Sequence, residues 1–378
     1  MTAGSAAALV ADDVRLMAAA IALGDAARGT TWPNPAVGAL VVRVEDGRPV
    51  IVGRGWTQAG GRPHAEPGAL AMAGAAARGA TLYVSLEPCA HFGKTPPCTE
   101  AIIQAGIARV VAAVGDPDPR TAGAGFAKLE AAGIEVVRDV LRAEGERSHA
   151  GHIRRVRDGR PHVMLKLAVS ADGKAGLAGP HPAAITSEAA RARVHMLRAL
   201  NDAIMVGIGT ALADDPELTC RLPGLAARSP VRVVLDPALK LPLSSRLVAT
   251  AGTVPLWLIA GADADVDRDR ALTMAGAEVM RVGRGADGRL DLAEVLRLLA
   301  LRGITRLMVE GGPTLAAALL GADLVDEAVV FGSNVVLGDD ALPALAGLPL
   351  TALTAAPALK TIERVAVGAD TMTVSRRI

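Results

Sequence analysis

The sequence predicts an α/β protein of two domains. Short β-branched runs alternate with longer Ala- and Leu-rich stretches along the chain, a pattern typical of this class. Its 378 residues are too many for one small domain and suit two. Between His149 and Arg160, histidine, arginine and aspartate crowd one short segment, which we interpret as a solvated linker or an exposed helix end. We therefore place the domains at residues 1–155 and 156–378.

The first domain is expected to open with a helix over residues 14–23. Clusters of β-branched residues predict strands at 37–44, 82–85, 110–114 and 134–137. Helical stretches between these strands fall at 68–78, 100–105 and 124–132. Gly106 and Gly133 close the last two helices, as glycine often does at a helix end.

The second domain repeats the alternation. We expect its strands at 163–169, 203–206, 231–235, 256–259, 278–282, 307–309 and 328–331. A glycine-rich turn leads into a helix at 315–320. Ligands of α/β proteins bind beyond the carboxyl ends of such strands, so the loops that follow them are the candidates for a binding site.

Composition excludes several classes of function. Lysine and arginine number 40 against 39 acidic residues, which argues against broad binding to nucleic acid or to an anionic membrane. Aromatic residues are only 2% of the chain, so stacking platforms for single strands are scarce. No apolar run approaches the roughly 18 residues of a membrane-spanning helix. Near the N-terminus, Asp12 and Asp13 are present and no basic segment precedes an apolar stretch, which argues against a secretory signal. The odd cysteine count favours a reducing compartment, so we expect a cytoplasmic protein.

His64, Cys89 and Cys98 are candidate zinc ligands. One imidazole and two thiolates suit zinc, and three protein ligands leave a fourth position for water, as a catalytic site requires. Glu66, two residues after His64, is the candidate general acid and base, while zinc lowers the pKa of the water toward 7. Cys98 precedes a predicted helix, whose N-terminal dipole favours the thiolate.

Other interpretations of these residues exist. A His-Ala-Glu triplet occurs often by chance, and the two cysteines stand nine residues apart, whereas the zinc deaminase signature is H-x-E followed by P-C-x-x-C. A structural zinc would need a fourth ligand, for which His91 or Cys220 are the candidates. Two reduced cysteines without metal are the third interpretation.

The motifs P-H-A-E, L-E-P-C and G-K-T-P-P-C resemble the deaminase domain of the bifunctional deaminase–reductases of riboflavin biosynthesis, in which the wider cysteine spacing is usual. The resemblance implies a cytidine-deaminase-like three-layer fold, with zinc on His64, Cys89 and Cys98 and with Glu66 as proton donor. The implied reaction is deamination of 2,5-diamino-6-(5-phosphoribosylamino)pyrimidin-4(3H)-one. Asn34 lies where such folds hold the edge of the pyrimidine.

The second domain carries no complete G-x-G-x-x-G, which argues against a Rossmann cofactor site. Its loop signatures resemble the reductase domain of the same family, which has a dihydrofolate-reductase-like fold and reduces the ribosyl side chain to ribityl with NADPH. The resemblance implies NADPH contacts at Ala168, Thr210, Asp214, Gly312, Pro313, Thr314 and Leu315. It implies substrate contacts at Arg198, Leu218, Arg221 and Glu310, with Lys166 as a further polar candidate. Two arginines suit a substrate phosphate, and the N–H groups of the glycine-rich turn suit a phosphate of the cofactor.

The family usually carries Ser-Gln-Trp where this chain has Pro182, Ala183 and Ala184. An alternative is therefore a deaminase whose C-terminal domain binds without reducing. A zinc-stabilised interaction module and a deaminase that edits nucleic acid are further alternatives. We expect a small phosphorylated pyrimidine as the partner, with no nucleic acid and no membrane, and a homo-oligomer is compatible with the sequence.

Overall fold

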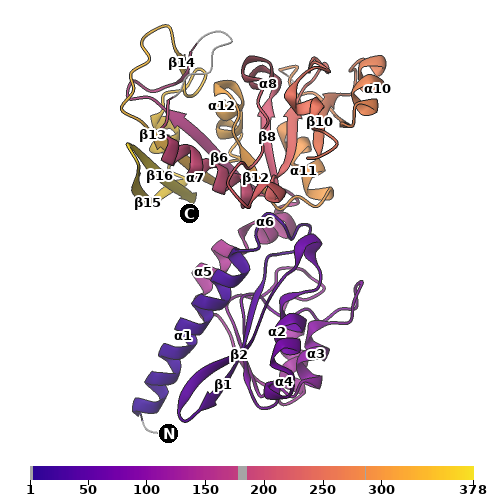
Figure 1. The fold of residues 1–378 in the computed structure, drawn as a ribbon, viewed down its shortest axis with the longest axis vertical. Coiled ribbons are helices and arrows are strands. Elements are labelled where there is room, and N and C mark those ends of the chain that lie inside the picture. Colours follow the sequence, from indigo (N-terminus) through magenta and orange to yellow (C-terminus); the bar gives the residue numbers. More distant parts are fainter. Residues whose placement is uncertain (1–2, 178–184, 286) are drawn as a thin grey trace. The chain divides into compact units, whose positions relative to one another are not determined.

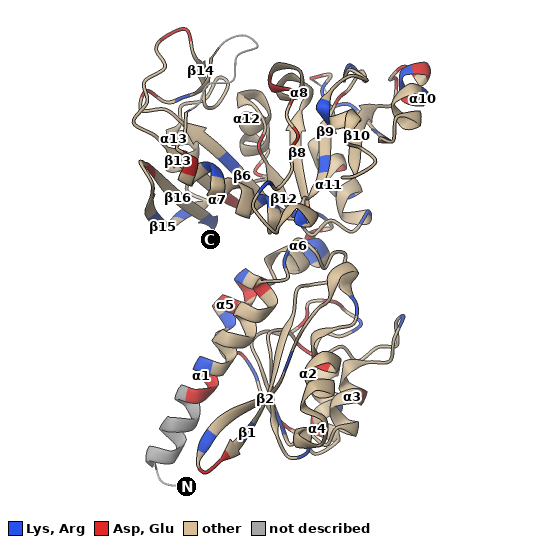
Figure 2. Cartoon of the chain, in the orientation of Figure 1, with Lys and Arg blue, Asp and Glu red and all other residues tan. Residues whose placement is uncertain are grey.

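A computed structural model describes residues 3–177, 185–285 and 287–378 (Figure 1). The chain divides into two compact units, Met1–Gly159 and Arg160–Ile378. The division falls inside the charged segment 149–160 that the sequence singles out. Figure 2 shows acidic and basic residues scattered along the elements of both units.

The first unit is a five-stranded sheet between helices. Its strands lie in the order β2-β1-β3-β4-β5, in which β1 is antiparallel to β2 and β3, while β3, β4 and β5 are parallel. The strands are β1 (Gly38–Glu45), β2 (Arg48–Trp56), β3 (Thr81–Val84), β4 (Arg109–Ala112) and β5 (Glu135–Val137). The helices are α1 (Ala3–Asp25), α2 (Ala65–Ala73), α3 (Cys98–Gln104), α4 (Ala124–Ala131), α5 (Arg142–Ser148) and α6 (Ala150–Asp158).

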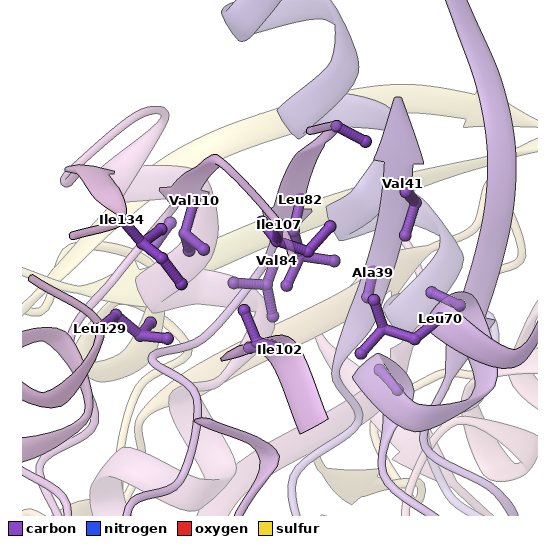
Figure 3. Close-up of a cluster of buried hydrophobic side chains, with 14 of the residues drawn as sticks. Ala39, Val41, Leu70, Leu82, Val84, Ile102, Ile107, Val110, Leu129 and Ile134 are labelled. Carbon is purple, nitrogen blue, oxygen red and sulfur yellow. The ribbon is translucent and has the colours of Figure 1, made fainter. Parts of the chain in front are cut away.

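Alternation along β1 builds a three-layer arrangement. Ala39 and Val41 face one way and join the core beneath α2, α3 and α4, which Figure 3 shows with Leu70 among the labelled side chains. Leu40 and Val42 face the other way and pack beneath α1. Because successive residues of a strand point to opposite faces, one apolar strand fills both cores. The three-layer fold expected from the family resemblance is confirmed.

The second unit is built on a nine-stranded sheet in the order β11-β10-β9-β8-β12-β6-β13-β16-β15. The strands from β11 to β13 are parallel, and β16 and β15 continue the sheet antiparallel. They are β6 (His162–Val169), β8 (Ala203–Gly207), β9 (Val231–Leu235), β10 (Leu256–Gly261), β11 (Glu278–Val282), β12 (Arg306–Val309), β13 (Glu327–Gly332), β15 (Leu359–Val367) and β16 (Asp370–Arg377). A two-stranded ribbon pairs β7 (Lys174–Gly176) with β14 (Leu342–Pro343).

Helices α7 (Glu188–Ala199), α8 (Ile208–Asp214), α9 (Arg246–Ala249), α10 (Val266–Met274), α11 (Leu292–Leu301), α12 (Pro313–Gly321) and α13 (Thr351–Thr354) connect these strands. All seven strands expected from the sequence are present in the parallel part of the sheet. The antiparallel pair β15 and β16 and the ribbon were not expected.

Two sequence expectations need correction. The helix expected at 68–78 begins earlier, at Ala65, and ends at Ala73, so Pro67 lies in its first turn, where proline is tolerated. The expected linker contains the helix α6, of which only Arg157 and Asp158 are exposed, while His149 and His152 are buried. The exposed charges therefore lie at the carboxyl end of a packed helix, so the interpretation as an exposed helix end holds and that as a solvated linker does not.

A buried ion pair joins α1 to the sheet. Asp13 accepts hydrogen bonds from Tyr83 Oη at 2.7 Å and from Arg109 Nη2 at 2.7 Å. Burial alone would raise the pKa of Asp13, but the hydrogen bonds from Arg109 and Tyr83 bring it below its usual value. Removal of one partner from such a pair leaves the other charge uncompensated.

We therefore expect Asp13→Asn to lower the free energy of unfolding by about 3 kcal/mol, as for other broken buried pairs. Asp12→Asn is the matched control, because Asp12 pairs with Arg15 on the surface at 2.8 Å, where such pairs contribute less than about 1 kcal/mol. Urea unfolding of both variants measures the difference. Equal losses of unfolding free energy in the two variants would show that the buried pair of Asp13 and Arg109 does not hold α1 in place.

Candidate functional site

Three candidate metal ligands lie where helices and a turn meet beyond β3. His64 occupies the N-cap position of α2, and Cys98 is the first residue of α3. Cys89 lies in the turn after β3. Gly61 forms part of the approach to His64 with a φ of +84°, and a Cβ there would lie 2.8 Å from the Cβ of Asn34, so only glycine fits.

The donor atoms of these residues converge. The Nδ1 atom of His64 lies 3.4 Å from Cys98 Sγ and 3.8 Å from Cys89 Sγ, and all three donors lie within 4.8 Å of one another. Tetrahedral zinc, with Zn–N and Zn–S distances of about 2.1 and 2.3 Å, separates its nitrogen and sulfur ligands by about 3.6 Å. The donor set therefore fits zinc in both chemistry and spacing.

The cluster has three ligands and no fourth among the described residues. His91, one candidate for completing a structural site, has its Nδ1 3.3 Å from Thr121 Oγ1. Cys220, the other, is buried in the second unit, where its N–H donates to Ser229 Oγ at 3.1 Å. Three ligands with an open position are typical of a catalytic zinc site.

The thiols and the carboxyl of Glu66 influence one another. The hydrogen bond from Cys98 lowers the pKa of Cys89 to about 4, so a thiolate is ready to bind a cation. Glu66 lies in the first turn of α2 and is only 4% exposed. Burial, with the negative charge of Cys89, raises the pKa of the Glu66 carboxyl above its usual value. A raised pKa favours a group that must both hold and release a proton.

Asn34, the residue predicted to hold the edge of the pyrimidine, lies beside the cluster. Its Nδ2 donates to Gly61 O at 2.8 Å and lies 3.4 Å from His64 Nε2. Arg62 stands on the same rim and donates to Thr95 Oγ1 at 2.6 Å. The structure therefore brings together all five predicted residues of the first unit.

Two buried groups of this region received no role from the sequence. The Glu87 carboxylate accepts four backbone hydrogen bonds, from the N–H groups of Asp116, Gly123, Gly125 and Phe126. His152 Nε2 lies 2.8 Å from Asp116 Oδ1. The L-E-P-C motif contains Glu87, so a signal existed, but nothing in the sequence showed which backbone groups it binds.

The second unit has a cavity of about 1410 Å³ at the carboxyl ends of its parallel strands. Most of the residues proposed for cofactor and substrate line it: Lys166, Ala168, Thr210, Asp214, Glu310, Gly312, Pro313, Thr314 and Leu315. The loop before α11, which includes Arg289, also lines the cavity, and no motif had indicated it. The α12 helix begins at the Gly312 turn without a side-chain cap, so its first N–H groups suit a phosphate.

The remaining three predicted residues, Arg198, Leu218 and Arg221, are not among the residues that line the cavity. Arg198 donates from Nε and Nη2 to both oxygens of Glu310, at 2.7 and 3.0 Å. Leu218 is buried, and Arg221 pairs with Glu217 at 3.3 Å with about half of its side chain exposed. Pro182, Ala183 and Ala184, where the sequence departs from the family, lie outside the described residues.

Comparison with known proteins finds a related family for each of the two units. A family model of the cytidine and deoxycytidylate deaminase zinc-binding region matches residues 10–114, and one of the RibD C-terminal domain matches residues 161–373. The riboflavin biosynthesis protein RibD of Escherichia coli is 41% identical over 370 residues, covering 95% of this chain and 97% of that protein. RibD of Bacillus amyloliquefaciens is 42% identical over 87% of this chain and 86% of its own length.

The chain belongs to the RibD family.

Solved structures of RibD proteins share the whole fold. RibD of Acinetobacter baumannii superposes with a TM-score of 0.85 at 31% identity, over 98% of this chain and 99% of that one. A Thermotoga maritima relative, titled a diaminohydroxyphosphoribosylaminopyrimidine deaminase and 5-amino-6-(5-phosphoribosylamino)uracil reductase, reaches 0.82 at 33% identity, over 97% and 99% of the two chains. The chain is thus a bifunctional RibD enzyme with a zinc-binding deaminase domain and a reductase domain. No described helix is long and apolar enough to cross a membrane.

The buried ion pair of Glu310 predicts a pH dependence of stability. Burial alone would raise the pKa of Glu310, but Arg198 and Lys166 lower it from 4.5 to about 2. A carboxyl whose folded pKa is lowered stabilises the fold above pH 4.5 and loses this contribution as the pH falls toward 2. At pH 7 we expect Glu310→Gln to cost about 3 kcal/mol, because two cations lose their partner.

The difference in unfolding free energy between wild type and Glu310→Gln should shrink steadily from pH 5 to pH 3. Urea unfolding followed by Trp257 fluorescence, with Trp32 and Trp56 replaced by phenylalanine, reports on the second unit alone. Glu278→Gln is the control, since Glu278 pairs with Arg302 on the surface. A difference that stays constant with pH would contradict the pKa shift.

Proposed function

We propose that the first unit deaminates a phosphorylated diaminopyrimidine and that the second reduces the ribosyl side chain of the product to ribityl with NADPH. We assign these activities to domains 1–155 and 156–378. The convergence of one imidazole and two thiols beside the buried carboxyl of Glu66 is the observation that carries this proposal. The reactions named for the Thermotoga maritima relative support the choice of substrate.

In the deaminase site, His64, Cys89 and Cys98 are proposed to hold zinc, which supplies Lewis acidity and lowers the pKa of water toward 7. Glu66 takes a proton from the attacking water and delivers it to the adjacent ring nitrogen, and it then moves the proton of the added hydroxyl to the departing amino group. The oxygen of water adds to the amino-bearing ring carbon, the carbon–nitrogen bond breaks and ammonia leaves. The buried Glu66 suits this shuttle because its raised pKa brings it closer to neutrality. Asn34 is proposed to bind the edge of the pyrimidine.

In the reductase site, NADPH supplies hydride to the side chain of the substrate. Ala168, Thr210, Asp214 and the turn Gly312, Pro313, Thr314 and Leu315 are proposed to bind the cofactor. Lys166, Arg198, Leu218, Arg221 and Glu310 are proposed to bind the substrate. Arg198 is already bonded to Glu310 on two nitrogens, so it orients that carboxylate, whereas the exposed guanidinium of Arg221 suits the substrate phosphate.

The alternative in which the C-terminal domain only binds is not favoured, because the relatives and the RibD C-terminal family model match across it. The proposal includes a small phosphorylated pyrimidine as the partner, no nucleic acid, and a cytoplasmic location. Because acidic and basic residues are nearly equal in number, the chain suits a small substrate bound by a few basic side chains better than it suits a polyanion such as nucleic acid.

A coupled assay tests both activities. Purified protein with zinc, NADPH and the diaminopyrimidine should release ammonia and then oxidise NADPH. Ammonia release without oxidation of NADPH would contradict the reductase half of the proposal, and the absence of both would contradict the whole.

Glu66→Gln should lower the rate of ammonia release at least 100-fold, because the glutamine amide neither accepts nor delivers the proton. Its zinc content and its reduction of the deaminated substrate should equal those of the wild type. Elemental analysis and the two separate assays measure these quantities. Glu100→Gln, a change of the same type on α3, is the control, and retained deamination in Glu66→Gln would remove Glu66 from the mechanism.

A further inference from the structure

The buried carboxylate of Glu87 accepts four hydrogen bonds from backbone N–H groups. It is only 3% exposed, and its Oε2 accepts from Asp116 N and Gly123 N, each at 3.1 Å. Its Oε1 accepts from Gly125 N at 3.0 Å and from Phe126 N at 3.2 Å. Each carboxylate oxygen has two lone pairs, so two N–H donors on each oxygen occupy all the acceptor sites of the carboxylate.

These bonds tie two segments together. Glu87 is separated from the candidate ligand Cys89 only by Pro88. The backbone groups that donate to Glu87 lie in the segment from the end of β4 to the first turn of α4. Gly123, the N-cap residue of α4, offers no side-chain cap, so Glu87 satisfies the free N–H groups at this helix start from another segment.

Packing and a second polar contact hold the same two segments. A Cβ on Gly125 would lie 2.1 Å from Pro88 O, so the backbone of α4 rests directly on the turn that leads to Cys89. Thr121 Oγ1 lies 3.3 Å from His91 Nδ1, on the other side of Cys89. The Cys89 turn is therefore held before and after the ligand.

The 116–126 loop also contacts helix α6. His152 of α6 contacts the carboxylate of Asp116 at 2.8 Å, and the side chains of both residues are about 10% exposed. Apart from the contacts with that loop, Cys89 accepts hydrogen bonds from Thr99 N at its carbonyl and from Cys98 N at its Sγ, both at 3.3 Å. Both of these come from the start of α3, whereas the bonds of Glu87 and His91 join the same turn to the 116–126 loop.

We propose that Glu87 is a positioning residue of the metal centre: by clamping the 116–126 loop to the Cys89 turn, it fixes the Cys89 thiolate in the place where a metal ion needs it. This inference rests on the proposed function as a zinc deaminase. Residues that orient metal ligands through such contacts typically raise metal affinity 10- to 100-fold.

Glu87→Gln separates this role from packing, because the amide has the same shape as the carboxylate. One end of the amide is NH₂, so two of the four N–H donors must face another donor whichever way the side chain turns. We expect the dissociation constant for zinc, measured by competition with a chelator, to rise about tenfold. Zinc-free Glu87→Gln should also exchange the amide hydrogens of residues 116–126 faster than the wild type.

Glu146→Gln is the matched control, since Glu146 lies on α5 of the same unit and pairs with Arg142 on the surface at 3.0 Å. Its zinc affinity and amide exchange should equal those of the wild type. Reductase activity, in the other unit of the same chain, should be unchanged in both variants. Failure of the wild type to bind zinc would contradict the proposed function, whereas wild-type binding with an unchanged affinity in Glu87→Gln would overturn this inference alone.

Gly125→Ala provides a second test if Glu87→Gln does not fold. The added Cβ would lie 2.1 Å from Pro88 O and 3.0 Å from Glu87 Oε1, so it pushes the loop away from the Cys89 turn while the carboxylate of Glu87 is retained. We expect a loss of zinc affinity of at least fivefold, with bound zinc still recoverable at high metal concentration. Affinity within twofold of the wild type would overturn the proposal in the same way.

Discussion

The deaminase site depends on how closely α2 approaches the sheet. A Cβ on Gly55 would lie 2.1 Å from Ala65 O, and one on Gly53 would lie 2.2 Å from Ala69 O. Two glycines of β2 therefore let a helix backbone lie directly on a strand backbone. Because Ala65 stands between His64 and Glu66, this contact sets the positions of a proposed metal ligand and of the proposed proton shuttle together.

The sites of the two units lie at the same place relative to the sheet, but they are built from different kinds of side chain. In both, side chains gather beyond the carboxyl ends of parallel strands, where α/β sheets bind ligands. In the first unit these side chains are an imidazole and two thiols, which are suited to binding a metal cation. The second gathers Lys166 and Arg198 around the single carboxylate of Glu310, beside a cavity large enough for organic ligands.

Much of this could be predicted from the sequence. Apolar runs such as 163–169 indicated the buried parallel strands, and the spacing of His64, Cys89 and Cys98 indicated the metal centre. The strand β2 was missed because most of it is exposed and its glycines break the apolar alternation. The pairing of Arg198 with Glu310 joins residues far apart in the chain, so no local pattern reports it. The role of Glu87 was missed because its partners are backbone groups, which every sequence contains.

The central claim is that one imidazole, two thiolates and an open position form the metal centre. X-ray absorption at the zinc edge of the zinc-loaded wild-type chain tests it most directly. The account predicts one zinc per chain with two sulfur neighbours at about 2.3 Å and two nitrogen or oxygen neighbours at about 2.0–2.1 Å, of which one is His64 and one is exchangeable solvent. A chain that binds no zinc, or a zinc without sulfur neighbours, would contradict it.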